Sequence, residues 1–188
     1  MTTKEIILHE AGKLFMAKGF QATSTREIAE LAKITQPNLY HHFKTKEDIY
    51  IAVLEQLSKE VKEGLEDIVR SDGSLLEKSL INILKYLQDK HPANFSIMSH
   101  DMTYEISEEN HAYLHHIWQT AYLEPVAGLF ERHYDREMLF TPQDLARYFY
   151  SSIAPFIQQD NHFYKKVTAE KVIYLFVYGI LDQEDKEC

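Results

Sequence analysis

The sequence of 188 residues has few of the residues that cross-link chains or build tight phosphate-binding loops. Its one cysteine, Cys188, excludes an intramolecular disulfide and any zinc site made of cysteines. Six glycines leave little material for glycine-rich phosphate cradles, and the sequence contains no nucleophile elbow, phosphate loop or metalloprotease motif. We therefore expect neither a catalytic site nor a cofactor.

Long apolar runs are also missing. No segment is long and apolar enough to cross a bilayer, and residues 1–11 carry charges where a signal peptide has its apolar region. We therefore expect a cytoplasmic protein with no membrane partner. Hydrophobic residues make up 45% and charged residues 26% of the chain, as in a globular protein with a substantial core.

Positive charge is scarce overall, and the net charge of −9 argues against binding to nucleic acid. The distribution is uneven, however. Residues 1–50 contain seven Lys or Arg and six Asp or Glu, whereas residues 51–188 contain thirteen and twenty-three. A near-neutral head on an acidic body fits a DNA-binding head carried by a body that repels DNA, although it fits many other proteins as well.

Apolar residues recur at helical spacing throughout the chain, and only short apolar runs hint at strands, so we predict an all-α fold. The first helix is predicted to begin at the cap Thr3 and to end at Gly19. Ser24 with Glu27 forms a capping box, and Thr35 and Thr45 cap the next two helices. Later helices are predicted over residues 75–89, 93–105, 108–134, 143–158 and 168–181, with a turn at 71–74 and a kink or break at Pro125.

Three short helices near the N-terminus, the last two joined by a tight turn, outline a helix-turn-helix. Leu39 and Phe43 are spaced to anchor the third helix on Ile28 and Phe15. Its opposite face shows side chains suited to a DNA groove: amides for adenine edges, a proline for a thymine methyl and a tyrosine for a phosphate. These residues are Gln36, Pro37, Asn38, Tyr40 and His41.

The same residues carry a family resemblance. Thr-Arg-Glu-Ile-Ala at 25–29 and Ile-Thr-Gln-Pro-Asn-Leu-Tyr-His-His-Phe-Lys-Thr-Lys-Glu-Asp-Ile at 34–49 resemble the signature of the TetR family of bacterial transcriptional regulators (TetR/AcrR type). The resemblance covers residues 5–55. It implies an all-α homodimer that represses transcription at a palindromic double-stranded operator and is released when a small molecule binds its body.

The resemblance also implies roles for single residues. Thr25, Tyr40, His42 and Lys46 would hold the DNA backbone, Gln36, Pro37 and Asn38 would touch bases, and His41 would point into the groove. Arg26 is evenly balanced between a groove contact and an ordinary surface position, and Lys46 has a solvated surface lysine as its alternative. The predicted DNA-binding set comprises Thr25, Arg26, Thr35, Gln36, Pro37, Asn38, Tyr40, His41, His42 and Lys46.

Lys33 departs from the family pattern, because a glycine usually stands at this point of the turn. If the residue adopts a left-handed conformation, a side chain there costs roughly 1–2 kcal/mol.

We predict a DNA-binding domain over residues 1–46 and a helical ligand-binding and dimerisation domain over residues 47–188. Aromatic and methionine side chains are abundant in the second domain, so we expect a small apolar or aromatic effector there, although each residue taken alone fits ordinary core better. The pocket candidates are Met98, Met102, Trp118 and Tyr122.

The segments 143–158 and 168–181 are predicted to form a four-helix bundle with a second copy of the chain. The last segment is apolar almost all round, so a monomer cannot bury it completely, and a two-fold pairing is the simplest solution. The predicted interface residues are Tyr148, Val172, Phe176 and Ile180.

Other functions stay open. Glu108, His111, His115 and His116 have helix-face spacing for a divalent metal, with His100 and Asp101 as a second candidate cluster. Surface histidines are more often solvated, so we predict no metal site and keep a metal-responsive regulator as the alternative. A helical enzyme or an adaptor without DNA affinity is a further, weaker alternative.

Overall fold

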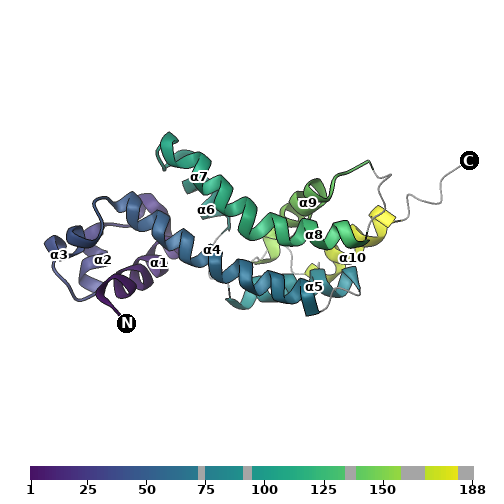
Figure 1. Ribbon diagram of the computed structural model, residues 1–188, viewed down its shortest axis with the longest axis horizontal. Helices are drawn as coiled ribbons and strands as arrows, with labels where there is room; N and C mark the ends of the chain where they lie inside the picture. Colours follow the sequence, from purple (N-terminus) through teal and green to yellow (C-terminus); the bar gives the residue numbers. More distant parts are fainter. Residues whose placement is uncertain (72–74, 91–94, 134–138, 158–167, 182–188) are drawn as a thin grey trace, which may run out of the picture. The chain divides into compact units, whose positions relative to one another are not determined.

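The computed structural model describes residues 1–71, 75–90, 95–133, 139–157 and 168–181 (Figure 1). Throughout these ranges the regular elements are helices, with no strand, which confirms the predicted all-α fold. The elements are α1 (Thr3–Ala22), α2 (Thr25–Leu31), α3 (Gln36–His42), α4 (Lys46–Ser71), α5 (Leu76–Lys90), α6 (Phe95–Tyr104), α7 (Glu108–Trp118), the π-helical turn η1 (Gln119–Leu123), α8 (Glu124–His133), α9 (Pro142–Ile157) and α10 (Ala169–Leu181). Of the predicted turn at 71–74, Ser71 is the last residue of α4, and residues 72–74 lie outside the described residues.

The chain divides into two compact units, each of which combines two stretches of sequence. The first unit comprises Met1–Glu60 and Pro92–Trp118, and the second comprises Val61–His91 and Gln119–Cys188. The units do not divide at residue 46, because α6 and the first half of α4 pack with the N-terminal helices. The functional boundary between residues 46 and 47 stays a prediction.

The first unit has one core built from all of its helices. Leu39 and Phe43 are buried and belong to the same core as Phe15 and Ile28, on which they were predicted to anchor. The ring of Tyr50 meets that of Phe15 edge-on, with centroids 5.0 Å apart. An interior this well packed fixes where the short helices α2 and α3 sit.

Local capping explains where these helices begin. Ser24 accepts from the Glu27 amide at 3.2 Å, Thr35 from the Asn38 amide at 3.4 Å, and Thr45 from the Asp48 amide at 3.0 Å. The caps Ser24, Thr35 and Thr45 are therefore confirmed, but the Glu27 carboxylate accepts from Lys18 and does not close the predicted capping box.

The two ends of α1 differ from the prediction. Its cap is Thr2, which forms a reciprocal capping box with Glu5, rather than Thr3. Gly19 does leave helical geometry, with φ 84° and ψ 175°, but the chain then resumes its helical course through Ala22. The predicted end at Gly19 is wrong because side chains of α6 and α4 bind the amide and the carbonyl of Phe20 at the break.

In the second unit, Pro125 sits just after a π-helical turn. A proline has no N–H and its ring clashes with the carbonyl four residues earlier, so a regular helix cannot pass through it. The Tyr150 hydroxyl donates to the carbonyl of Tyr122 at 3.0 Å and satisfies one backbone group of the turn. The predicted interruption of the segment 108–134 at Pro125 is confirmed.

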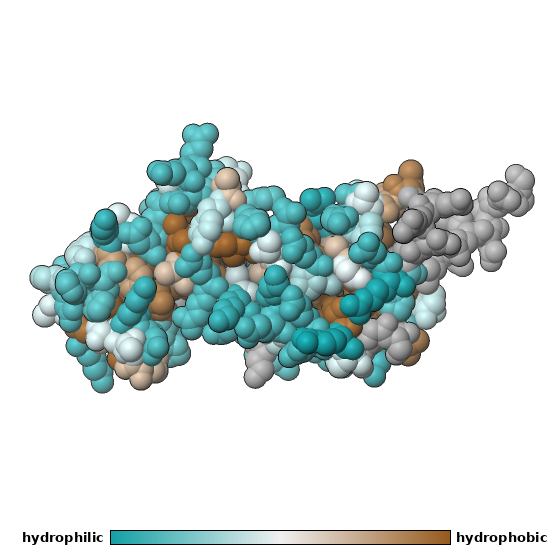
Figure 2. Space-filling model, in the orientation of Figure 1, coloured by the Kyte–Doolittle hydropathy of each residue, from teal (hydrophilic) through white to brown (hydrophobic). Residues whose placement is uncertain are grey.

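None of the helices among the described residues combines the length and apolar character that a bilayer crossing requires. On the face drawn in Figure 2, hydrophilic side chains cover most of the surface, with apolar side chains visible between them.

Candidate nucleic-acid interface

The turn between α2 and α3 is the first element of the candidate interface. The Ile34 amide donates to the Ala29 carbonyl at 3.0 Å and the Lys33 amide to the Glu30 carbonyl at 3.1 Å, which folds the chain back tightly. Lys33 has φ 56°, and within the described ranges it is the one non-glycine residue with positive φ. The left-handed conformation considered for Lys33 is therefore present, at a lysine.

Helix α3 turns one face to the core and the other to solvent. Leu39 is completely buried, whereas Tyr40 is 47% exposed. The other predicted reading residues all lie on the exposed side: Gln36, Pro37, Asn38, His41 and His42. Thr35 is exposed as well, and its hydroxyl is occupied as the cap of α3. The fold therefore presents amide, proline, tyrosine and histidine side chains on one short helix, as a groove-reading helix requires.

Two hydroxyl groups from different helices meet beside this face. The Thr25 Oγ1 and Tyr40 Oη atoms are 3.0 Å apart, at hydrogen-bonding distance. One hydroxyl donates to the other, so the pair keeps one O–H that can be donated to a phosphate oxygen. The sequence suggested each residue separately, and the fold brings them together.

Arg26 lies along its own helix. Its Nε donates to Glu30 Oε1 at 3.0 Å, and its side chain is 77% exposed. An ion pair this exposed is weak, so the guanidinium is free to leave Glu30 for a phosphate or a base. Both readings of Arg26 remain compatible with the geometry.

Lys46 is half-buried, and its ammonium is bonded to the end of α1. Its Nζ donates to the carbonyls of Phe20 at 2.8 Å and Thr23 at 3.1 Å, and it lies 4.1 Å from the centre of the Phe20 ring. Burial lowers the pKa of Lys46, against the opposing effect of the Asp101 and Glu105 charges. An ammonium has three donors, so one N–H is left for the predicted DNA-backbone contact.

Asp101 of α6 is a functional candidate that the sequence presented only as part of a metal cluster. It is 4% exposed, and its Oδ2 accepts from the Phe20 amide at 2.8 Å and the Tyr50 hydroxyl at 3.4 Å. Burial raises the pKa of Asp101 despite these bonds. A helix break at Gly19 signals an amide in need of an acceptor, but nothing local identifies a partner 81 residues away.

Glu47, in the first turn of α4, holds the start of α7. Its Oε1 accepts from the Ser107 amide at 3.1 Å, the Ser107 hydroxyl at 2.6 Å and the Asn110 amide group at 2.7 Å. Burial acts to raise the pKa of Glu47, but these hydrogen bonds outweigh it, and the pKa lies below its usual value. The partners of Glu47 are 60 and 63 residues away, so no local sequence signal could identify them.

The four pocket candidates do not converge within one unit. Met98 is buried in the core of the first unit, and Met102 packs on that same core. Trp118 is half-buried at the end of α7, 6.3 Å from the ring of His115, whereas Tyr122 is buried in the second unit. Their grouping into one ligand pocket stays a prediction.

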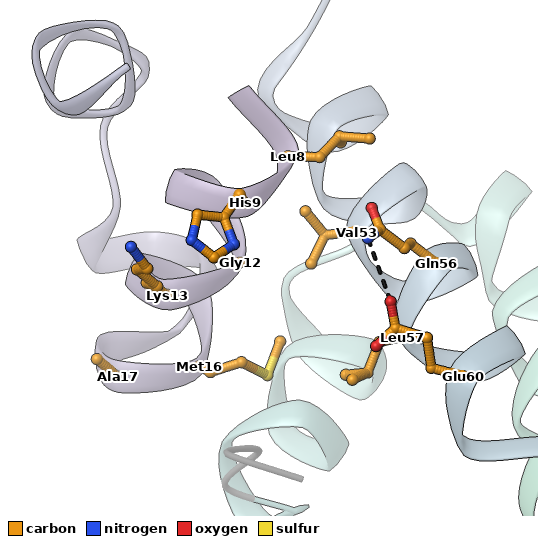
Figure 3. A pocket seen from close by; sticks show the side chains of 10 residues that line it. All are labelled: Leu8, His9, Gly12, Lys13, Met16, Ala17, Val53, Gln56, Leu57 and Glu60. Atoms are coloured by element: carbon orange, nitrogen blue, oxygen red, sulfur yellow. Dashed lines mark hydrogen bonds between the residues drawn. The ribbon is translucent and has the colours of Figure 1, made fainter. Parts of the chain in front are cut away.

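A groove of about 390 Å³ lies elsewhere, between α1 and α4 of the first unit (Figure 3). Apolar side chains, among them Met16, Val53 and Leu57, line it, and polar residues stand at its rim. There Gln56 donates to Glu60 at 3.3 Å. None of the predicted pocket residues contributes to this groove.

The candidate metal ligands do not form a site either. In the part of the chain that the structure describes, no three His, Cys, Asp or Glu side chains are grouped closely enough to hold a metal ion. His100 and Asp101 are neighbours, with Nδ1 and Oδ1 3.9 Å apart, but Asp101 is already engaged by α1.

The predicted dimer residues are placed differently from one another. Tyr148 is 53% exposed, whereas Val172 and Phe176 are half-buried. The Phe176 ring lies 6.0 Å from that of Phe130 and 6.1 Å from that of Phe149, so it faces the core of its own unit. The Ile180 side chain lies outside the described residues. Among the side chains of α10 that the structure describes, the large exposed apolar ones are Tyr174, Leu175 and Tyr178.

Comparisons with known proteins agree with this geometry. The family model described as "Bacterial regulatory proteins, tetR family" matches residues 7–53. The HTH-type transcriptional regulator QacR of Staphylococcus aureus is 44% identical over 54 residues, which is 29% of this chain and 29% of QacR. The match thus spans less than a third of that relative's own length.

Solved structures extend the likeness to nearly the whole chain. A TetR transcriptional regulator from Legionella pneumophila superposes with a TM-score of 0.76 at 21% identity, covering 96% of this chain and 98% of that one. The transcriptional regulator FadR from Bacillus subtilis, solved with stearoyl-CoA, gives 0.72 at 17% identity, covering 94% and 98%. At these identities the likeness shows that the fold is shared.

Proposed function

Since the chain carries the N-terminal domain of the TetR family of bacterial regulatory proteins at residues 7–53, we propose that it is a DNA-binding transcriptional regulator and not an enzyme. The observation that carries the proposal is the outward face of α3, whose reading side chains stand clear of the core while Leu39 and Phe43 anchor it. A regulator of transcription acts on the chromosome, in the cytoplasm.

We assign the contacts by chemistry. Gln36 and Asn38 can each bond an adenine edge through two hydrogen bonds, and Pro37 can meet a thymine methyl. Thr25 and Tyr40 bind a phosphate through the one O–H that their hydrogen-bonded pair leaves available, and His42 and the third N–H of Lys46 bind the backbone nearby. His41 points into the groove, and Arg26 reaches it after leaving Glu30.

The operator is proposed to be a palindrome read by a homodimer. Two recognition helices related by a two-fold axis read half-sites about 34 Å apart, or a multiple of that distance. The exposed apolar side chains of α10, together with Tyr148 of α9, support a second copy as their cover, since contiguous exposed apolar surface usually marks an interface.

The regulator is further proposed to be a repressor that a small apolar or aromatic molecule releases from DNA. Support comes from the aromatic and methionine content of residues 95–156 and from the stearoyl-CoA bound to FadR, a protein of the same fold. Stearoyl-CoA is therefore the first probe. If it acts as effector, linkage requires that operator DNA and stearoyl-CoA weaken each other's binding by the same factor. Equal affinities for free and DNA-bound protein would exclude it as the effector.

Selection from random duplex DNA tests the DNA-binding proposal. The full chain should enrich a palindromic sequence, and fluorescence anisotropy should then show an affinity roughly 10³-fold or more above that for random duplex. A triple variant, Gln36→Ala, Asn38→Ala and Tyr40→Phe, should lose this preference while keeping its helical circular dichroism. Enrichment of no sequence by a folded dimer would contradict the proposal.

A further inference from the structure

The last turn of α1, Gly19–Thr23, is held by two helices that are distant in sequence; we call it the α1 end. Gly19, at φ 84°, interrupts the α-helical ladder, so the amides that follow lose their regular partners. Asp101 of α6 replaces one such partner by accepting the Phe20 amide at 2.8 Å. The break in α1 is therefore closed by a side chain from another helix.

Helix α6 approaches this break so closely that a side chain on Gly19 would be crowded. A Cβ atom on Gly19 would lie 3.1 Å from Ile97 Cγ2 and 3.4 Å from both carboxylate oxygens of Asp101. The same carboxylate accepts the Tyr50 hydroxyl of α4 at 3.4 Å, and the residue is almost completely buried. Asp101 is thereby fixed from two sides.

Lys46 holds the opposite, carbonyl pole of the α1 end. Its ammonium binds the carbonyls of Phe20 and Thr23, and the Thr23 hydroxyl closes the turn on the Gly19 carbonyl at 2.8 Å. A carboxylate at the amide pole and an ammonium at the carbonyl pole both match the partial charges of the turn.

The position of the DNA-binding residues follows from this arrangement. Helix α2 begins at Thr25, two residues after the α1 end, and Thr25 is the partner of Tyr40 on α3. We propose that Asp101 is a positioning residue for the DNA interface: it fixes the α1 end against α6, and so sets where α2 begins. This inference rests on the proposed function, and it connects α6 to the proposed DNA interface through the α1 end.

The test compares three variants of the full chain. Asp101→Ala removes the oxygen that accepts the bonds from Phe20 and Tyr50. Asp101→Asn keeps an amide oxygen that can accept both bonds, and Thr103→Ala is the matched control. Thr103 is an exposed residue of α6 whose hydroxyl bonds the Ser99 carbonyl of its own helix. The readouts are amide hydrogen exchange and affinity for the duplex selected by the wild-type chain, measured across a salt series.

We expect Asp101→Ala to speed exchange in residues 19–31 while α9 and α10 stay protected. Affinity for the selected duplex should fall about ten-fold, within the usual range for coupling between sites, with an unchanged salt slope because no lysine or arginine that neutralises a phosphate is removed. Asp101→Asn should restore most of the affinity, and Thr103→Ala should match the wild-type chain.

The assignment is wrong if residues 19–31 of the Asp101→Ala variant exchange at the wild-type rate. It is also wrong if exchange becomes faster evenly over the whole chain. Local loosening with full operator affinity would overturn it as well. If the wild-type chain selects no duplex, the proposed function fails by itself, and the exchange result still decides whether Asp101 holds α2 in place.

Discussion

At the scale of single residues, the candidate nucleic-acid interface depends on the backbone conformation of Lys33 as well as on side-chain chemistry. Lys33 passes the chain from α2 to α3 at φ 56°, where its Cβ crowds the backbone. A glycine would adopt this conformation without strain, although it would also lose more entropy on folding. The lysine thus gives up stability in a turn that directly precedes the reading helix.

Lys33→Gly should therefore raise the free energy of unfolding, by up to about 1 kcal/mol, since relief of the left-handed strain exceeds the added entropy cost. Urea denaturation measures the change. Lys33→Ala is the control, because it removes the same side chain and keeps the strain. An equal gain from both substitutions would trace the effect to the lysine side chain instead.

The reading face should separate specificity from general affinity. Gln36→Ala should relax discrimination at one operator base pair and cost roughly 1–3 kcal/mol on the operator alone. Tyr40→Phe removes one of the two paired hydroxyls and should weaken binding to operator and random duplex alike. Anisotropy titrations on both duplexes measure this. Equal losses for Gln36→Ala on the two duplexes would remove Gln36 from the specificity set.

At the scale of elements, two glycines inside helices have opposite surroundings. A Cβ on Gly64 of α4 would lie 2.2 Å from Cζ and 2.3 Å from the hydroxyl oxygen of Tyr86, whereas a Cβ on Gly128 of α8 would meet nothing within 4 Å. The missing side chain of Gly64 thus leaves the space in which the Tyr86 ring of α5 packs against α4. Gly128 has no such neighbour.

Alanine at these positions should change stability in opposite directions. Gly64→Ala should lower the free energy of unfolding by about 1–3 kcal/mol, because the Tyr86 ring must move out of its packed position. Gly128→Ala should raise it by about 0.5–1 kcal/mol through helix propensity alone. The two variants are each other's control, and thermal or urea unfolding measures both. A stabilising Gly64→Ala would mean that Tyr86 moves aside without loss.

The junction of α4 with α7 should be sensitive to acid. The pKa of Glu47 is lowered in the folded chain, so its stabilising effect is complete above its usual pKa of 4.5 and is lost as the pH falls through the lowered value. Glu47→Gln should melt below the wild-type chain at pH 7, and this difference should shrink as the pH falls below 4.5. Glu109→Gln, at an exposed position of α7, is the control. A difference in melting temperature that stays constant with pH would rule out the carboxylate as its source.

At the scale of the whole molecule, the apolar side chains of α10 have two separate uses. Phe176 completes the core of its own unit by packing on Phe130 and Phe149. Leu175 is 72% exposed and Tyr174 is 55% exposed. A charged residue at Phe176 would therefore test folding as well as association.

The double variant Tyr174→Glu and Leu175→Glu should sediment as a monomer and keep its helical content, because charges would replace the apolar cover between the two copies. Leu31→Glu is the matched control: Leu31 is also an exposed leucine, at 48%, but it lies on α2 in the other unit. A double variant that remains dimeric would place the dimer interface elsewhere.

Local sequence was sufficient to predict where α2, α3 and α4 begin and which side of α3 faces solvent. Capping by Ser24, Thr35 and Thr45 involves residues three positions apart, and the burial of Leu39 behind an exposed Tyr40 follows from helical periodicity. The interruption at Pro125 follows from the missing N–H of that residue. Each of these signals acts over a few residues, so a single sequence contains it.

Long-range packing settled the rest. Asp101 meets an amide 81 residues away, and Lys46 meets carbonyls 23 and 26 residues away. The same holds for Phe176, which the sequence predicted for a dimer face and whose ring packs on Phe130 and Phe149 of its own unit in the folded chain. A residue type states which partner a charge or ring needs, but only the folded chain determines which distant group comes within bonding distance, because that choice depends on the packing of every helix between them.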